Sequence, residues 1–137
     1  MKFTIVGAGK SGVHAAILAQ DLGYDVFLTE SKTEQDCAEA AATLKERGIE
    51  AEFGGHTAKG LDADIFVASP GIPPSSSYLQ EAEQRGTPVI SEVEFAWRHI
   101  DSARNPVVAI TGTNGKTTTT ALTAHIFNHS GKKAVAC

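Results

Sequence analysis

Short apolar runs alternate with amphipathic stretches along the first hundred residues. Runs rich in β-branched residues predict strands, and apolar residues at helical spacing predict the helices between them. This alternation predicts an α/β fold in which a Rossmann-like parallel sheet carries helices on both faces. The predicted strands are residues 2–6, 24–29, 49–53, 65–68 and 87–90, and the predicted helices are residues 11–22, 32–48, 75–85 and 92–99.

A polar stretch at residues 101–106 breaks both periodicities and ends in Pro106. It predicts a domain boundary, and we divide the chain into residues 1–104 and residues 105–137. Beyond it, the pattern predicts a strand at 106–111, a helix at 116–129 and a further strand from 132. Two strands and one helix do not cover the faces of a parallel sheet, so we interpret this segment as the truncated start of a P-loop ATPase domain.

Composition removes several classes of function. The 137 residues carry a net charge of −4, which gives no basic excess for nucleic acid. The two cysteines offer neither a metal-binding spacing nor a disulfide framework. Because the N-terminal apolar run is too short for a signal peptide or a membrane span, we expect a cytoplasmic protein without membrane contact.

The first predicted strand opens into a G-x-G-x-x-G pattern formed by Gly7, Gly9 and Gly12. Between a strand and a helix, this pattern gives a tight turn, close approach to a diphosphate, and close helix–strand packing. Glu30 ends the next strand about twenty residues later, where an acid commonly accepts hydrogen bonds from the ribose of a dinucleotide. Alone, this half predicts a nicotinamide or flavin binder, and the alternative for Glu30 is a surface residue that starts a loop.

The strand at 65–68 is followed by Ser69-Pro70-Gly71-Ile72-Pro73-Pro74. Its prolines predict a rigid loop at the carboxyl end of a strand, where open α/β sheets bind ligands. A turn with a purely structural role is the alternative.

The run 107–110 leads into Thr111-Gly112-Thr113-Asn114-Gly115-Lys116-Thr117-Thr118. A glycine-rich turn between a strand and a helix aims backbone N–H groups at a phosphate. Lys116 would reach the terminal phosphates and the Thr117 hydroxyl would ligate Mg²⁺, so we predict a nucleoside triphosphate site. Ile110 stands where a full phosphate loop has glycine, and a turn with a solvated lysine is the alternative.

Three stretches resemble the Mur ligase family. Residues 111–118 resemble its ATP-binding signature, in which a short first half of the phosphate loop is normal. Residues 69–72 resemble a loop beside the diphosphate of the uridine nucleotide, and residues 90–98 resemble the end of the first domain in the D-glutamate-adding branch. The resemblance covers the entire chain.

This resemblance implies a cytoplasmic ligase of peptidoglycan precursor synthesis. It would use ATP and Mg²⁺ to join D-glutamate to UDP-N-acetylmuramoyl-L-alanine through an acyl phosphate. Two phosphate-binding loops in one chain agree with this, because a nucleotide-linked acid and ATP both have to be held. Metal ligands and the amino-acid-binding domain of the family lie beyond residue 137, so we expect the chain alone to be inactive.

The resemblance also assigns residues. Near the diphosphate it places Gly9, Lys10, Ser11 and Gly71, and near uridine Glu30, Ser31 and Lys32. For ATP it implies Gly112, Thr113, Asn114, Gly115, Lys116, Thr117 and Thr118, with Lys116 neutralising charge on the transferred phosphoryl group and Thr117 on Mg²⁺.

Other interpretations stay open at this point. An NAD(H)-binding regulatory module would use the glycines and Glu30, and sequence does not separate uridine from nicotinamide at that strand end. A muramate:L-alanine ligase and a folylpolyglutamate-synthase-like ligase share the ATP signature. We assign His56 no role, as a surface imidazole, and interpret Phe95 and Trp97 as packing residues.

Overall fold

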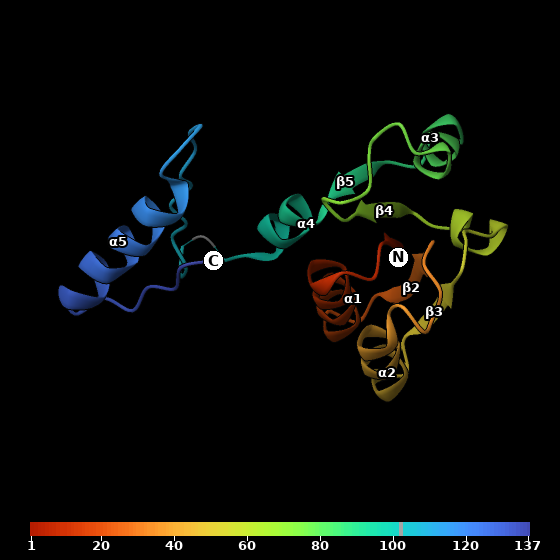
Figure 1. Ribbon diagram of the computed structural model, residues 1–137, viewed down its shortest axis with the longest axis horizontal. Coiled ribbons are helices and arrows are strands. Elements are labelled where there is room, and N and C mark those ends of the chain that lie inside the picture. The colour runs from red at the N-terminus through yellow and green to blue at the C-terminus, as the bar shows by residue number, and fades with distance from the viewer. Residues whose placement is uncertain (102) are drawn as a thin grey trace. The chain divides into compact units, whose positions relative to one another are not determined.

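The computed structural model describes residues 1–101 and 103–137. It divides into two compact units, Met1–Ile100 and Asp101–Cys137, which are described separately (Figure 1). Part of the predicted linker at 101–106 falls on Ser102, which lies outside the described residues.

The first unit is built on a five-stranded sheet in which every neighbouring pair is parallel. The strands lie in the order β3-β2-β1-β4-β5, so the chain changes direction across the sheet between β1 and β4. This is the position at which open α/β sheets bind ligands. The strands are β1 (Lys2–Val6), β2 (Asp25–Glu30), β3 (Glu50–Phe53), β4 (Ile65–Ala68) and β5 (Val89–Ser91).

Helices cover both faces of this sheet, which confirms the predicted fold class (Figure 1). On one face lie α1 (Lys10–Asp21), α2 (Ala38–Arg47) and α4 (Glu92–His99), and α1 contacts both of the others. The other face is covered by α3 (Ser77–Gln84) and the short 3-10 helix η1 (Ala58–Leu61).

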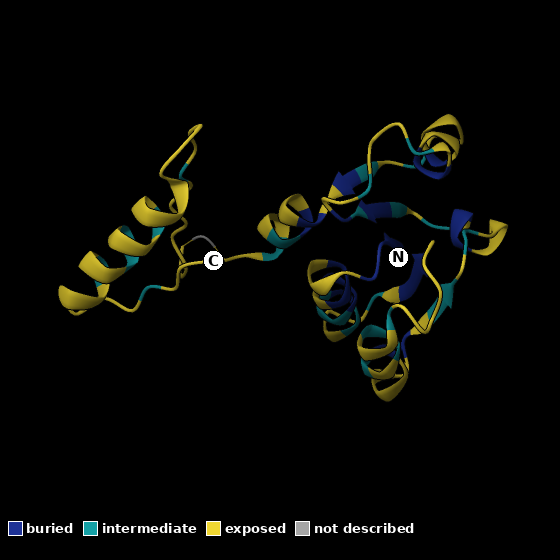
Figure 2. Ribbon diagram, viewed as in Figure 1, coloured by how far each residue is buried: buried dark blue, intermediate teal, exposed yellow. Residues whose placement is uncertain are grey.

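The core forms two clusters because successive strand residues point to opposite faces. Ile5 and Leu28 join the cluster under α1, while Val6 and Phe66 join the cluster under α3. Figure 2 shows the buried residues concentrated in the strands and on the inner sides of the helices. Burial of this kind supplies the main free energy that stabilises the first unit.

The predicted start of α4 is confirmed, but one predicted packing residue is wrong. The Ser91 hydroxyl accepts a hydrogen bond from the Glu94 amide at 3.1 Å and caps the helix. Phe95 is 0% exposed, whereas Trp97 is 53% exposed. Residues two apart lie on different sides of a helix, so the two aromatic side chains cannot share the buried face.

The second unit contains α5 (Lys116–His129), as predicted. No strand forms at residues 106–111 or 132–137, all of which are described, so both strand predictions are wrong there. A strand requires a hydrogen-bonded neighbour, and these segments do not pair into a ladder. Instead, the segment after α5 is held by the Asn128 side chain, which bonds the amide and carbonyl of Ala134 at 2.9 and 3.0 Å.

Membrane-spanning helices require a long apolar stretch. None of the helices in the described part of the chain combines that length with that apolar character.

We predict that Gly12→Ala destabilises the first unit. A Cβ at residue 12 would lie 2.0 Å from the Gly7 carbonyl oxygen and 2.8 Å from the Ser69 hydroxyl. Because backbone has to move to accept it, the expected loss in free energy of unfolding is about 1–3 kcal/mol. Urea denaturation followed by circular dichroism measures this change.

Gly9→Ala is the matched control, since a Cβ there meets nothing within 4 Å. Its backbone is extended, with φ −68° and ψ 171°, a conformation open to alanine. The expected change is within about 0.5 kcal/mol. Equal losses in the two variants would contradict the packing argument.

Candidate nucleotide-binding sites

The glycine-rich loop between β1 and α1 is tight and presents the start of a helix. Gly7 has φ +106°, which favours glycine, and its amide donates to the Thr29 carbonyl at 2.9 Å. The first intrahelical bond of α1 runs from the Val13 amide to the Gly9 carbonyl. The amides before Val13 therefore precede the helical ladder and suit an anion. The predicted residues Gly9, Lys10 and Ser11 are exposed at this end of α1.

The loop after β4 lies directly against this glycine loop. The Ser69 amide donates to the Val6 carbonyl at 3.0 Å, and the Ser69 side chain lies where a Cβ on Gly7 or Gly12 would meet it at 3.0 or 2.8 Å. The structure thus brings the loop that carries Gly71 beside the loop that carries Gly9. The sequence analysis assigns Gly71 of this loop to the diphosphate but not Ser69. The Ser69 hydroxyl is buried and has no hydrogen-bond partner in the described part of the chain.

Glu30 connects two loops through its carboxylate. Oε2 accepts from the Ala8 amide at 2.7 Å, while Oε1 accepts from the Lys32 amide at 2.9 Å and the Ser31 hydroxyl at 3.1 Å. Burial of this residue, 6% exposed, would raise its pKa, but these hydrogen bonds outweigh burial and lower the pKa. The carboxylate therefore stays ionised and holds the β1–α1 loop to the segment after β2.

A cavity of about 360 Å³ lies next to this edge of the sheet. It is lined by residues from the 68–74 segment, α3 and β5, including Ser69, Ile72 and Leu79. The lining is mostly apolar, with the Ser69, Glu83 and Ser91 side chains as polar members.

The loop before α5 has the form expected of a phosphate site. Gly115, with φ +78°, caps the helix, and the first intrahelical bond runs from the Thr119 amide to the Gly115 carbonyl. The amides of residues 116–118 therefore precede the helical ladder and can meet an anion. The Lys116 ammonium donates to the Gly112 carbonyl at 2.6 Å, which places its charge over the loop. These residues fit a bound phosphate.

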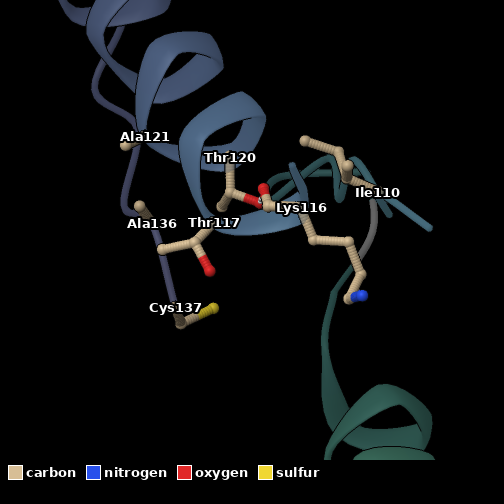
Figure 3. Close-up of a pocket in the computed structure, with 7 residues that line it drawn as sticks. All are labelled: Ile110, Lys116, Thr117, Thr120, Ala121, Ala136 and Cys137. Atoms are coloured by element: carbon tan, nitrogen blue, oxygen red, sulfur yellow. Dashed lines mark hydrogen bonds between the residues drawn. The ribbon is translucent and has the colours of Figure 1, made fainter. Parts of the chain in front are cut away.

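A cavity of about 460 Å³ lies beside the start of α5 (Figure 3). In Figure 3, Thr117 lies on the same side as Cys137, and the Lys116 side chain extends away from them. No group of three or more His, Cys, Asp or Glu side chains in residues 1–101 and 103–137 is placed to hold a metal. The Thr117 hydroxyl thus remains a prediction as a Mg²⁺ ligand. The cavity is lined by Ile110, Lys116, Thr117, Thr120, Ala121, Ala136 and Cys137.

His56 is not the surface imidazole that the sequence predicts. It is half-buried, its Nδ1 lies 2.7 Å from the Thr29 hydroxyl, and its ring stacks on Tyr78 with centroids 4.6 Å apart. The adjacent Gly54-Gly55 pair indicates a sharp turn, but nothing in the local sequence identifies these partners. They come from β2 and α3, and only the folded sheet brings them together.

The sequence model of the MurD N-terminal domain matches residues 2–78. The UDP-N-acetylmuramoylalanine–D-glutamate ligase of Salinibacter ruber is 53% identical over 124 residues, which cover 90% of this chain and 26% of that enzyme. The enzyme of the same name from Cytophaga hutchinsonii is 45% identical over 133 residues, covering 95% and 28%. The chain therefore spans about a quarter of the length of these relatives.

Solved Mur ligases have a similar fold. The UDP-N-acetylmuramate–alanine ligase MurC of Thermotoga maritima matches with a TM-score of 0.63 and 29% identity, covering 96% of this chain and 30% of that one. A murein peptide ligase of Psychrobacter arcticus matches with a TM-score of 0.67 and 25% identity, covering 96% and 27%.

We predict that Glu30 makes the first unit sensitive to acid. A carboxyl group whose pKa is lowered by folding stabilises the protein above its unfolded pKa, near 4.5, and loses that contribution as pH falls through the folded pKa. Glu30→Gln is expected to cost about 1–3 kcal/mol at pH 7 and to flatten the fall in stability below about pH 5. Urea unfolding across pH 3–7 measures both effects.

Glu81→Gln is the control, because Glu81 is an exposed residue that bonds only Arg85, at 2.7 Å, among its described side-chain partners. Its stability curve is expected to follow that of the unmodified chain. An identical pH dependence for Glu30→Gln and the unmodified chain would contradict the role given to the Glu30 carboxylate.

Proposed function

Because the chain belongs to the MurD N-terminal domain family, we propose that it is part of an ATP-dependent ligase that joins D-glutamate to UDP-N-acetylmuramoyl-L-alanine in peptidoglycan precursor synthesis. The observation that carries the proposal is the contact between the Ser69 side chain and Gly7 and Gly12. It joins two backbone loops at the carboxyl edge of the sheet, where the diphosphate of a nucleotide sugar would be held.

The first unit would bind the uridine nucleotide. Gly9, Lys10 and Ser11 offer amides and one ammonium group at the exposed start of α1, and Gly71 lies in the adjoining loop. A diphosphate gains from both the helix N-terminus and the lysine charge. The uridine end would lie at the segment after β2, formed by Glu30, Ser31 and Lys32.

Glu30 favours this reading over an NAD(H)-binding module. A carboxylate has about four acceptor positions, and protein donors occupy three of them here. Little acceptor capacity remains for a ribose diol, which is the ligand of this acid in dinucleotide-binding domains. Within the 30–32 segment, the Lys32 amide and the Glu30 and Lys32 carbonyls already have protein partners, so contact with a base would come from the Ser31 backbone and the Lys32 side chain.

The second unit would bind ATP together with Mg²⁺. ATP would transfer its γ-phosphoryl group to the alanyl carboxylate and leave as ADP, and the D-glutamate amine would then displace phosphate from the acyl phosphate. Lys116 would hold the terminal phosphates and neutralise charge on the transferred group, and Thr117 would contribute a hydroxyl to the metal. The amides of the loop and of the first turn of α5 would hold the other phosphate oxygens. The residues involved are Gly112, Thr113, Asn114, Gly115, Lys116, Thr117 and Thr118.

Specificity for D-glutamate is favoured by the names of the similar enzymes. Relatives at 53% and 45% identity are D-glutamate ligases, whereas the alanine ligase MurC is 29% identical. We keep the division into a UDP-sugar domain at 1–104 and an ATP domain at 105–137, and a cytoplasmic location, as parts of this proposal.

We predict that the chain binds UDP and UDP-N-acetylmuramoyl-L-alanine in preference to NADH. Calorimetric titration of the unmodified chain with each ligand measures this order. Gly9→Ala adds a methyl group that meets nothing within 4 Å at the N-cap of α1. It is expected to weaken UDP binding about tenfold, because the diphosphate has to approach the backbone closely there. Lys45→Ala, a change on α2, is the control expected to bind UDP normally. Preference for NADH would overturn the proposal.

We also expect no phosphate release when this chain alone is incubated with ATP, D-glutamate and UDP-N-acetylmuramoyl-L-alanine. Among the described residues, Thr117 is the one side chain that we assign to the metal, and no acidic cluster accompanies it. A coupled phosphate assay checks this expectation, and sustained turnover would show it to be wrong.

A further inference from the structure

A hydrogen-bonded chain of side chains lies on the face of the sheet opposite α1. Thr29, fully buried, donates its hydroxyl proton to Glu52 Oε1 at 2.7 Å. His56 Nδ1 lies 2.7 Å from the same hydroxyl oxygen. Because the single hydroxyl proton goes to the carboxylate, the Nδ1–H of His56 has to be the donor in the second bond. The imidazole therefore donates to the hydroxyl, and the hydroxyl donates to the carboxylate.

Glu52 fixes the donor-to-acceptor direction of these hydrogen bonds. Its carboxylate also accepts from the Thr57 amide at 2.9 Å and from the Thr57 hydroxyl at 2.6 Å. Burial would raise the pKa of Glu52, but the bonds from Thr57 and Thr29 and the nearby His56 together lower the pKa. A carboxylate that stays ionised keeps the Thr29 proton directed toward it, so the Thr29 oxygen is free to accept from His56.

The loop that leads to His56 is bonded to the segment that we assign to uridine. The Gly54 amide donates to the Lys32 carbonyl at 2.7 Å, and the Gly55 amide donates to the Glu30 carbonyl at 3.2 Å. The Thr29 carbonyl accepts from Gly7, the first glycine of the β1–α1 loop. Gly54 and Gly55, which precede His56, thus hold the 30–32 segment from one side, while Thr29 joins it to the diphosphate loop.

The imidazole is itself fixed by an aromatic contact. Its ring stacks on Tyr78 at an interplanar angle of 18°, and the Tyr78 hydroxyl donates to the Thr57 carbonyl at 3.1 Å. Tyr78 is 7% exposed and belongs to α3, which follows the loop that carries Gly71. Stacking removes rotational freedom from His56, so its Nδ1–H has one partner and one direction.

We propose that His56 is a positioning residue for the nucleotide site, acting through Thr29 on the segment formed by Glu30, Ser31 and Lys32. The inference rests on the proposed binding of a uridine nucleotide by the first unit. His56 does not touch the nucleotide in this account. It sets the geometry of the segment that does.

Two substitutions remove the two bonds of the chain with little change in shape. His56→Phe keeps the stacked ring and removes Nδ1–H, and Thr29→Val replaces the hydroxyl by a methyl group. His56→Phe removes one hydrogen bond and is expected to weaken UDP binding about two- to tenfold. Thr29→Val removes both hydrogen bonds, including the one to the carboxylate, and is expected to weaken UDP binding at least as much. The double variant is expected to bind as the weaker single variant does, since both changes break one chain.

Thr29→Ser keeps the hydroxyl and is expected to restore UDP affinity to within about twofold of the unmodified chain. Tyr24→Phe is the matched control, because it removes a part-buried tyrosine hydroxyl that lies 3.3 Å from His99 Nε2, outside the group formed by His56, Thr29 and Glu52. It is expected to lower the urea midpoint and leave the UDP affinity unchanged. Circular dichroism establishes that each variant is folded before titration.

A second measurement uses the unmodified chain and does not depend on variant stability. Nitrogen-15 spectra are expected to show a proton on His56 Nδ1, and the amide signals of Lys32 and Gly54 are expected to move with His56 as UDP is added. No UDP binding by the unmodified chain would overturn the proposed function and this inference with it. Normal UDP binding by His56→Phe and Thr29→Val, or a His56 signal without response, would overturn the inference alone.

Discussion

The first unit depends on the Glu30 carboxylate, which is hydrogen-bonded to the loop after β1 and to the segment after β2. Glu30 accepts hydrogen bonds from the Ala8 amide and the Lys32 amide, so the turn after β1 and the turn after β2 cannot move apart without leaving a buried charge unpaired. The close approach of Gly12 to the Gly7 carbonyl fixes the same turn from the helix side. Together these contacts keep the start of α1 at the carboxyl edge of the sheet, where the candidate site lies.

Two successive residues of β2, Thr29 and Glu30, make hydrogen bonds on opposite faces of the sheet. Glu30 points toward the α1 face and bonds the glycine loop, while Thr29 points toward the α3 face and bonds Glu52 and His56. Strand alternation makes this possible without any insertion or bulge. Polar groups on both faces thus bond the backbone at the end of β2. They fix the conformation of this segment, although it lies at the carboxyl ends of the strands, where the sheet stops.

Local signals account for what the sequence predicted well. Four strands of the first unit follow from apolar runs and β3 from an alternating pattern, and the Ser91 cap follows from the identity and spacing of two residues. Partners distant in sequence account for what it missed. His56 meets Thr29 and Tyr78 through the assembled sheet, and the segments at 106–111 and 132–137 carry strand-forming residues without forming a ladder. The roles assigned to individual binding residues remain predictions, because they concern ligands rather than the fold.

The Lys116 ammonium already donates hydrogen bonds to two carbonyls of its own loop, those of Gly112 and Thr113, at 2.6 and 3.4 Å. When an anion binds, the ammonium exchanges these neutral carbonyl acceptors for charged oxygen atoms of the anion. The net gain is the difference between two sets of bonds, and it grows with the charge of the newcomer. If the loop binds phosphate as we propose, it would favour anions of high charge density, and weakly charged solutes would compete poorly with a polyphosphate for the same lysine.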